Sequence, residues 1–345
     1  VNIDIIANKL LKVIPSNESF IIETVFDANT EYSSYSNIFL IIIRKIKKLK
    51  LEKINFDINR LLNSHFETSV DFYTIVQKCL HNYTLEYKNY IWLLRLVKPQ
   101  YCFVIQNGIQ KALFSAAKDL NIKCIELQHG QINNFHIAYS YSNKIDYSHL
   151  KSFPNILFTF SDFWNKVNYP VNEKISMGVD NNPFEVENII TKDIAFIFSN
   201  SYAENLLSFL KKLAPQFENK IYVKLHPKQN NGIEYLKKEL AEFKNIKLIY
   251  MGKTMDETLS LVSSIVMIQS TVIYEALQKN KKVFLYKKQD YATQSDVFDN
   301  PNVYLIDSVE EFITYKDELF KNQNKISYFD DFNQDKFLSY IKDYK

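Results

Sequence analysis

Four short polar segments each follow a stretch that is predicted to be a buried strand. They are Gln128-His129-Gly130, Ser199-Asn200-Ser201, His226-Pro227-Lys228 and Gln269-Ser270-Thr271. Imidazole can take up or release a proton near neutral pH, and hydroxyl and ammonium groups bind anionic oxygens. A lone histidine is more often a surface or capping residue, but four such segments in equivalent places favour one shared site.

The second half of the chain offers groups that would hold a phosphate. Ser270 and Thr271 open a predicted helix over 272–278, and the free N–H groups at a helix start attract anions. Ser270 is also a good helix cap, and the two roles are compatible. His226 would donate to the same phosphate. The other predicted nucleotide or phosphate contacts are Pro227, Lys228, Ser199, Ser201, Met251 and Gly252.

Glu275 follows Thr271 by one helical turn. A carboxylate at this place can accept both hydroxyls of a ribose. A solvated surface glutamate is an equally good interpretation.

His129 belongs to the first half of the chain and is the predicted general base. A neutral imidazole can take a proton from an acceptor hydroxyl, and Gly130 lets a ligand approach the backbone closely. Gln128 and Gly130 are placed on the acceptor side. His136 is the second choice for the catalytic role. As carboxylate partners of His129, Asp146 and Asp162 are favoured over Glu126, which precedes it on the same predicted strand.

Hydrophobic periodicity predicts the elements that must position the first of these segments. Apolar residues at helical spacing begin at Phe72 and give a helix that ends before Pro99. A strand over 101–106, a helix over 109–120 and a strand over 122–127 follow as a β-α-β unit. Because such strands pair in parallel, the Gln128 segment lies at the carboxyl edge of the sheet.

A further strand over 156–160, with Ser161 as a helix cap, precedes the polar stretch 180–183. We place a domain boundary there and predict domains over 1–180 and 181–345, with the C-terminal helix crossing back to the first domain. Beyond the boundary, six strands alternate with helices, which include 203–213 and 233–243, and Thr254 and Glu257 form a capping box. The predicted strands cover 194–198, 221–225, 246–250, 265–268, 283–286 and 303–306.

This alternation predicts an α/β protein with doubly wound parallel sheets, which bind ligands at their carboxyl edge. The 345 residues suffice for two such domains at about 100–200 residues each. Two tandem domains would face each other across a cleft, where residues from both halves can meet.

Composition excludes several classes of protein. The net charge of +3 is too small for bulk binding of nucleic acid, and the five glycines form neither a dinucleotide fingerprint nor a P-loop, so no bound cofactor is expected. The three cysteines are interpreted as reduced core thiols, and no metal site is expected. The longest apolar run, 38–43, is too short to span a membrane, and no secretory signal is evident, so we expect a cytoplasmic protein.

The same apolar run is followed by five basic residues within seven positions, 44–50. This pattern is typical of contact with an anionic inner leaflet, and equally of a solvated helix face.

Three segments together resemble a known family. Glu-Leu-Gln-His-Gly (126–130), Val-Lys-Leu-His-Pro (223–227) and Gln-Ser-Thr-Val-Ile-Tyr-Glu-Ala-Leu (269–277) resemble bacterial GT-B glycosyltransferases of surface polysaccharide synthesis, of capsule and lipopolysaccharide type. The resemblance covers roughly residues 99 to 290 and is strongest to enzymes that use cytidine nucleotides: polysialyltransferases, β-Kdo transferases and CDP-glycerol glycerophosphotransferases.

The resemblance implies a GT-B fold of two Rossmann-like domains and a transferase that moves a sugar from CMP-sialic acid or CMP-Kdo to a glycan or lipid-linked glycan. It assigns His129 as base, His226, Ser270 and Thr271 to the donor phosphate, and Glu275 to the ribose. The teichoic-acid enzymes commonly have Trp-His-Gly-Thr where this chain has Gln-His-Gly-Gln, which ranks CDP-polyol phosphate transfer lower. No Asp-x-Asp follows a predicted strand, so metal-independent transfer is expected. A nucleotide-sugar 2-epimerase or a non-catalytic nucleotide-sugar-binding protein on the same fold are the remaining alternatives.

Overall fold

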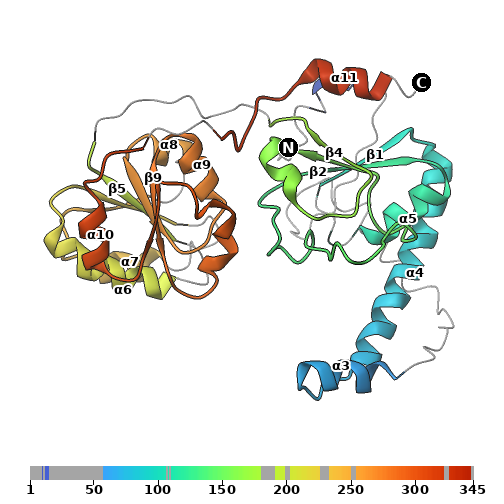
Figure 1. Ribbon diagram of the computed structural model, residues 1–345, viewed down its shortest axis with the longest axis horizontal. Coiled ribbons are helices and arrows are strands. Elements are labelled where there is room, and N and C mark those ends of the chain that lie inside the picture. The colour runs from blue at the N-terminus through green and yellow to red at the C-terminus, as the bar shows by residue number, and fades with distance from the viewer. Residues whose placement is uncertain are drawn as a thin grey trace.

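The computed structural model describes residue 10 and residues 12–14, 57–105, 108, 110–179, 191–198, 203–225, 233–249, 254–321 and 326–342. They form two α/β domains, each built on a parallel sheet, and the two lie side by side (Figure 1). The α/β architecture predicted from the sequence is thereby confirmed.

The first sheet has four described strands in chain order, β1-β2-β3-β4. Their bounds are β1 Tyr101–Ile105, β2 Lys123–Leu127, β3 Ile156–Thr159 and β4 Glu173–Ser176. In register, Ile105 faces Leu127 across β1 and β2, so the segments that follow both strands leave the same edge. The Gln128 segment lies at this edge, as the β-α-β pattern predicts.

Alternating side chains of β2 face two different layers. Cys124 packs with α4 (Phe72–Val97) and α5 (Lys111–Asp119) on one face of the sheet. Ile125 and Leu127 pack on the other face, together with Leu10 and with Phe337 of α11 (Gln334–Lys342). A two-residue period therefore gives both faces of this strand an apolar cover.

The second sheet has six described strands, all parallel, in the order β10-β9-β8-β5-β6-β7. Its strands are β5 Ile194–Ile197, β6 Ile221–Lys224, β7 Ile246–Ile249, β8 Ser264–Met267, β9 Lys282–Tyr286 and β10 Val303–Ile306. Its helices are α6 Ala203–Leu213, α7 Ile233–Glu239, α8 Met255–Leu259, α9 Val272–Gln278 and α10 Val309–Tyr315, with short 3-10 turns η4 Ala214–Gln216 and η6 Tyr291–Val297.

The strand order of the second sheet reverses between β5 and β8. The first three strands run outward from β5 to one side, and the last three run outward from β8 to the other. Doubly wound sheets bind their ligands at the carboxyl ends of the two strands that flank such a reversal. The residues after β8, Gln269 to Thr271, therefore lie at the expected ligand crevice.

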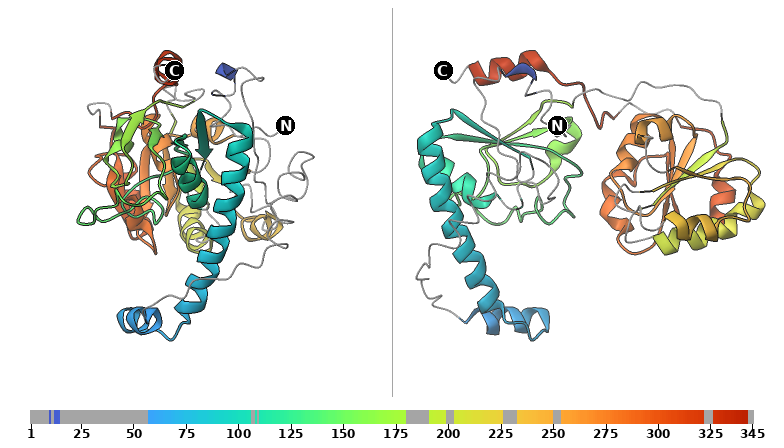
Figure 2. Two further views of the ribbon diagram at one scale, coloured as in Figure 1. Left: turned by 90° about the vertical axis from the view of Figure 1, so that its right-hand side faces the viewer. Right: turned by 180° about the vertical axis from the view of Figure 1, so that it is seen from behind.

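The C-terminal segment returns from the second domain to the first, as Figures 1 and 2 show for α11. Val179 forms a parallel bridge with Asp331, and the ring of Phe337 is fully buried against the first sheet. Gly178 permits this crossing because its φ is +81°, and an added Cβ would lie 2.1 Å from the carbonyl oxygen of Asp331.

One apolar core joins the two domains. Trp164, in the 3-10 turn η2 (Asp162–Lys166), packs its ring 4.6 Å from that of Tyr274 in α9. Its Nε1 donates a hydrogen bond to the carbonyl of Tyr328 at 2.7 Å. The same core includes Tyr139 and Leu157 from the first domain and Ile265 and Val283 from the second.

A helical arm projects from the first domain (Figures 1 and 2). It consists of α3 (Ile58–Phe66) and the first half of α4. The second half of α4 packs on α5, and Tyr83 at that point donates to Ser115 at 2.6 Å. The helix predicted from Phe72 to before Pro99 is confirmed.

Several local predictions differ from the structure. Ser161 does not cap the turn that follows; its hydroxyl donates to the carbonyl of Ser327 at 2.7 Å. Cys79 is exposed rather than in a core, whereas Cys124 is buried and Cys102 is partly buried.

The proposed boundary at 180–183 and the apolar and basic run at 38–50 lie outside the described residues. No helix in the described part of the chain is long and apolar enough to cross a bilayer.

Candidate functional site

The segment after β2 and the segment after β8 meet at the boundary between the two domains. A Cβ added to Gly130 would lie 4.0 Å from Cγ2 of Thr271, and among the described residues other than its chain neighbours no atom would lie nearer. Gly130 belongs to the first domain and Thr271 opens a helix of the second. The two motifs, 141 positions apart along the chain (271 minus 130), are therefore neighbours in space.

Gln128 shapes the loop that carries His129. Its side chain is 1% exposed; Nε2 donates to the carbonyl of Gly130 at 2.8 Å, and Oε1 accepts from the N–H of Phe160 at 2.9 Å. Both polar ends of the side chain are thus used within the first domain, which does not support the predicted contact of Gln128 with an acceptor. His129, next to it, is partly exposed beside the domain boundary.

His136 is held in one tautomer by its own loop. Its Nδ1 accepts a hydrogen bond from the N–H of Ala138 at 3.2 Å, so the neutral ring carries its proton on Nε2. Burial lowers the pKa of His136, which favours this neutral form. The geometry therefore favours His136 as a hydrogen-bond donor to an anionic oxygen over the alternative role of base.

A buried carboxylate, Glu126, connects to His136 through a tyrosine. Glu126 is fully buried and accepts hydrogen bonds from the hydroxyls of Tyr139 and Tyr169, the latter at 2.8 Å. The Tyr139 ring packs 5.0 Å from that of His136, so the carboxylate supports the histidine loop through this tyrosine. Desolvation lowers the pKa of the nearby Lys111, and the negative charge of Glu126 opposes that change.

The two carboxylates predicted as partners of His129 accept hydrogen bonds from residues close to them in the sequence. Asp146 is exposed and accepts from the N–H of Ser148 at 2.8 Å. Asp162 is also exposed and accepts from Nδ2 of Asn165 at 3.0 Å. Glu126, which the sequence analysis ranked below these two, is instead fully buried and accepts hydrogen bonds from two tyrosine hydroxyls.

Amide side chains fasten the histidine loop to the second domain. Nε2 of Gln131 and Nδ2 of Asn133 both donate to the carbonyl of Thr293, at 2.8 and 2.7 Å. Nε2 of Gln294 donates back to Oε1 of Gln131 at 2.9 Å. Sequence reasoning missed these residues, although the run of amides at 131, 133 and 134 directly after the His-Gly pair was a usable signal.

On the second domain, Ser270 stabilises the start of α9. Its Oγ accepts from the N–H of Val272 at 3.3 Å, while Thr271 is exposed toward the first domain. Glu275, one turn later, is partly buried, and its burial raises the pKa of the carboxyl group to about 7. The carboxylate of Asp256 adds to this rise, and Lys279, which forms an ion pair with Asp256, opposes it.

The other predicted contacts, Ser199, Ser201, His226, Pro227, Lys228, Met251 and Gly252, lie outside the described residues. Lys224, the last residue of β6, lies two positions before His226. Burial lowers the pKa of its ammonium group, and the charge of Glu257 opposes that change. In the described ranges, no three His, Cys, Asp or Glu side chains are grouped as a metal ion would require.

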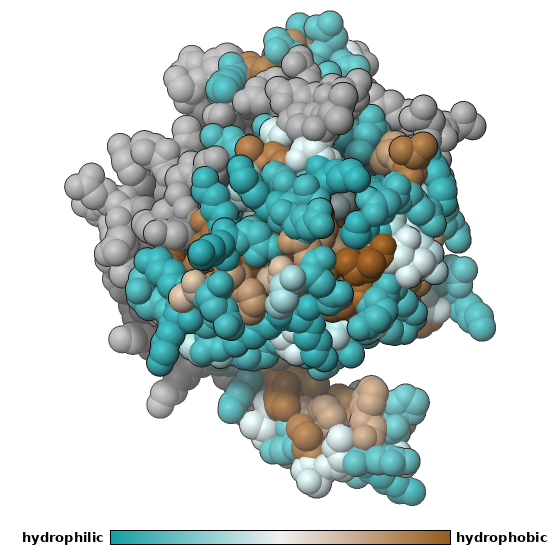
Figure 3. All heavy atoms as spheres, turned by 90° about the vertical axis from the view of Figure 1, so that its left-hand side faces the viewer, coloured by the Kyte–Doolittle hydropathy of each residue, from teal (hydrophilic) through white to brown (hydrophobic). Residues whose placement is uncertain are grey.

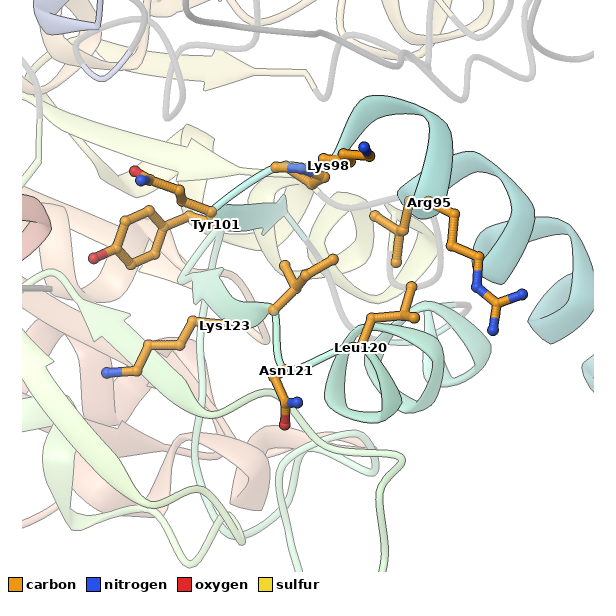
Figure 4. A pocket seen from close by; sticks show the side chains of 10 residues that line it. Arg95, Lys98, Tyr101, Leu120, Asn121 and Lys123 are labelled. Atoms are coloured by element: carbon orange, nitrogen blue, oxygen red, sulfur yellow. The ribbon is translucent and has the colours of Figure 1, made fainter. Parts of the chain in front are cut away.

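A separate pocket of about 510 Å³ opens at the opposite edge of the first sheet (Figure 4). It lies where α4 and α5 end and where β1 and β2 begin, beside Tyr101 and Leu120. Arg95 and Lys98 lie at the end of α4, where positive charge stabilises the helix dipole, and Lys123 points away from both in the view of Figure 4. The pocket is thus distinct from the site at the domain boundary.

Comparison with known proteins agrees with this architecture. A family model described as "Capsule polysaccharide biosynthesis protein" matches residues 189–295, which hold β5 to β9. No curated protein sequence matches the chain.

Three similar solved structures are UDP-GlcNAc 2-epimerases. The putative enzyme from Listeria monocytogenes has 13% identity and a TM-score of 0.54, covering 76% of this chain and 79% of that one. The Neisseria meningitidis enzyme bound to UDP-GlcNAc has 13% identity and a TM-score of 0.51, covering 90% and 89%. The Methanocaldococcus jannaschii enzyme has 14% identity and a TM-score of 0.51, covering 77% and 82%. At these identities the likeness concerns the fold, so the chain has the GT-B fold of two Rossmann-like domains.

Proposed function

We propose that this protein is a glycosyltransferase that moves a sugar from a nucleotide-sugar to a growing bacterial surface glycan. The observation that carries the proposal is the proximity of Gly130 to Thr271, whose Cγ2 would lie 4.0 Å from an added Cβ; it brings the histidine loop of one domain to the start of α9 in the other. The capsule-synthesis model matching residues 189–295 supports the class of product. The epimerase bound to UDP-GlcNAc supports a nucleotide-sugar as the ligand of this fold.

In the proposed reaction, the donor binds the second domain and the acceptor enters from the first. His129 takes the proton from the acceptor hydroxyl, whose oxygen forms the new bond to the anomeric carbon. The bond from that carbon to the nucleotide phosphate breaks, and the phosphate leaves with the electron pair. His226, Ser270 and Thr271 stabilise the charge that develops on it, and no metal is needed for this step.

We further propose that the donor is a cytidine nucleotide-sugar, CMP-sialic acid or CMP-Kdo. The sequence resemblance of the 223–227 and 269–277 segments supports this choice. The test is a panel of CMP-, UDP-, GDP- and dTDP-sugars, with the melting temperature of the protein as the measurement. The proposal requires the largest rise with a CMP-sugar; a response to UDP-sugars alone would remove the cytidine assignment.

The catalytic assignment is tested by His129→Ala. We expect transfer to fall by roughly 100- to 10,000-fold, as for loss of a general base, while the donor-induced rise in melting temperature stays. His226→Ala should instead weaken donor binding. His149→Ala is the matched control, because His149 is an exposed histidine of the same domain that lies outside the candidate site. Equal loss of binding and transfer in His129→Ala would contradict its role as base.

The same assays distinguish the alternatives. Conversion of UDP-GlcNAc without any acceptor would replace the proposal with a 2-epimerase. Transfer from CDP-glycerol would replace it with a polyol phosphotransferase. Donor binding without turnover, across a panel of glycan acceptors, would leave a nucleotide-sugar-binding protein.

A further inference from the structure

The projecting arm, residues 57–82, carries apolar side chains that the rest of the described chain does not cover. All of these residues are described, and none of their side chains is buried. Figure 3 shows brown, apolar side chains gathered on the arm below the body of the molecule. The large exposed ones are Leu61, Phe66, Val70, Tyr73, Ile75 and Leu80.

The arm is nevertheless a built structure. Asp57 caps α3 by accepting from the N–H of Arg60 at 3.0 Å, and Asp71 caps α4 by accepting from the N–H of Thr74 at 3.1 Å. The amide of Asn63 closes the connection, donating to the carbonyl of Val70 at 2.9 Å and accepting from its N–H at 3.0 Å. A hairpin fixed in this way holds its apolar side chains in water, which is unusual for a surface without a partner.

We propose that the arm is a dimerisation surface whose partner is the arm of a second copy of this chain. In a two-fold contact each patch meets its own copy, so a patch of one charge sign would repel itself. The charges of the arm nearly balance: Asp57, Glu67 and Asp71 are acidic, and Arg60 and Lys78 are basic. Only part of residues 57–82 can enter such a contact, whereas a standard interface takes about 20–30 residues from each side, so we expect a weak dimer.

A lipid surface fits the arm less well. Helices that lie on anionic membranes carry a polar face rich in Lys and Arg. The arm carries only two Lys or Arg residues, Arg60 and Lys78, and two of its carboxylates lie at its helix starts, Asp57 and Asp71. The charges of the arm therefore favour the arm of a second copy over an anionic membrane as its partner.

Light scattering of the full chain after size exclusion tests the proposal. We expect a concentration-dependent dimer whose dissociation constant rises at least about 30-fold in Leu61→Glu/Ile75→Glu, since each charge would enter an apolar contact. Leu319→Glu is the matched control, because Leu319 is 86% exposed on the second domain, away from the arm. Circular dichroism checks folding, and Phe66→Ser/Leu80→Ser repeats the test should the first pair fail to fold.

Cys79 supplies an independent readout, because it is the exposed thiol of the arm. A bis-maleimide should link two copies through Cys79, and the link should be lost in Cys79→Ser and in Leu61→Glu/Ile75→Glu. Three results would overturn the proposal: a monomer at every concentration, a dimer that the arm substitutions leave unchanged, or binding to phosphatidylglycerol vesicles that the same substitutions abolish. None of these outcomes depends on whether the protein transfers sugar.

Discussion

Burial changes the chemistry that Glu275 can perform. The usual pKa of 4.5 rises to about 7, with desolvation as the main cause and Asp256 as the second. A carboxyl group with this pKa is partly protonated in the free protein at neutral pH. A ribose whose hydroxyls donate to the group would favour its ionised form, so binding should release a proton.

We therefore predict a pH-dependent difference between wild type and Glu275→Gln. The raised pKa contributes stability that is fully present below pH 4.5 and is lost as the pH rises through about 7. Between these values the unfolded state releases the proton of Glu275 while the folded state retains it. Chemical denaturation should show that the free energy of unfolding of Glu275→Gln increases relative to that of wild type as the pH rises from 4.5 to above 7. A constant difference across this range would contradict the assignment.

Nucleotide titrations give the same prediction a second readout. Wild-type affinity should increase as the pH rises through about 7, and that of Glu275→Gln should be roughly tenfold weaker at high pH with little pH dependence. Loss of affinity at every pH to the same extent would point to a role in packing.

At this scale, the sequence predicted which residue types gather but not how each is used. His129 and Thr271 follow strands, and the rule for parallel sheets brings both to carboxyl edges. The two internal hydrogen bonds of Gln128 depend on the position of Phe160, which no spacing rule provides. The tyrosines that hold Glu126 come from loops 13 and 43 positions away, so they were not predictable from the strand pattern.

At the scale of elements, periodicity predicted most helices and strands to within a few residues. Helices 203–213 and 272–278 match α6 and α9, and the Thr254 capping box is present as predicted. The helix predicted over 233–243 ends at Glu239, because its last turn tightens into the bond from the N–H of Ala241 to the carbonyl of Lys238. The order of strands depends on long-range pairing and was outside the reach of local patterns.

The crossing at Gly178 is an element-scale feature with a sharp prediction. Gly178→Ala would place a Cβ 2.1 Å from the Asp331 carbonyl oxygen at a φ of +81°, so the returning segment must move. We expect a loss of more than about 2 kcal/mol in the free energy of unfolding. Gly108→Ala is the control, since nothing lies within 4 Å of its added Cβ. Equal denaturation midpoints for the two variants would contradict the prediction.

At the scale of the whole molecule, the shared core and the amide contacts connect the two domains. Trp164 of the first domain contacts Tyr274 and Tyr328, and Asn133 reaches Thr293. Separating the domains would expose these apolar side chains to water and break the hydrogen bonds between them.

We predict a single unfolding transition for the whole chain. In Trp92→Phe the one remaining tryptophan, Trp164, reports on the junction between the domains. Its fluorescence and the far-ultraviolet circular dichroism should change at the same denaturant concentration. A fluorescence change that comes first would show that the domains part before either unfolds. In the otherwise wild-type chain, Trp164→Phe should lower the denaturation midpoint followed by circular dichroism, because it removes the hydrogen bond to the carbonyl of Tyr328.

The returning C-terminal helix has a consequence for how the protein is made. Strands β5 to β10 all precede α11 along the chain, so they are synthesised before the helix that covers the first sheet. The first domain is synthesised earlier, yet one face of its sheet lacks Phe337 until residue 337 has been added. The first domain therefore cannot complete its core until the second domain and the segment after it have been synthesised. A nascent chain that stalls before residue 337 would leave Ile125 and Phe158 exposed to chaperones.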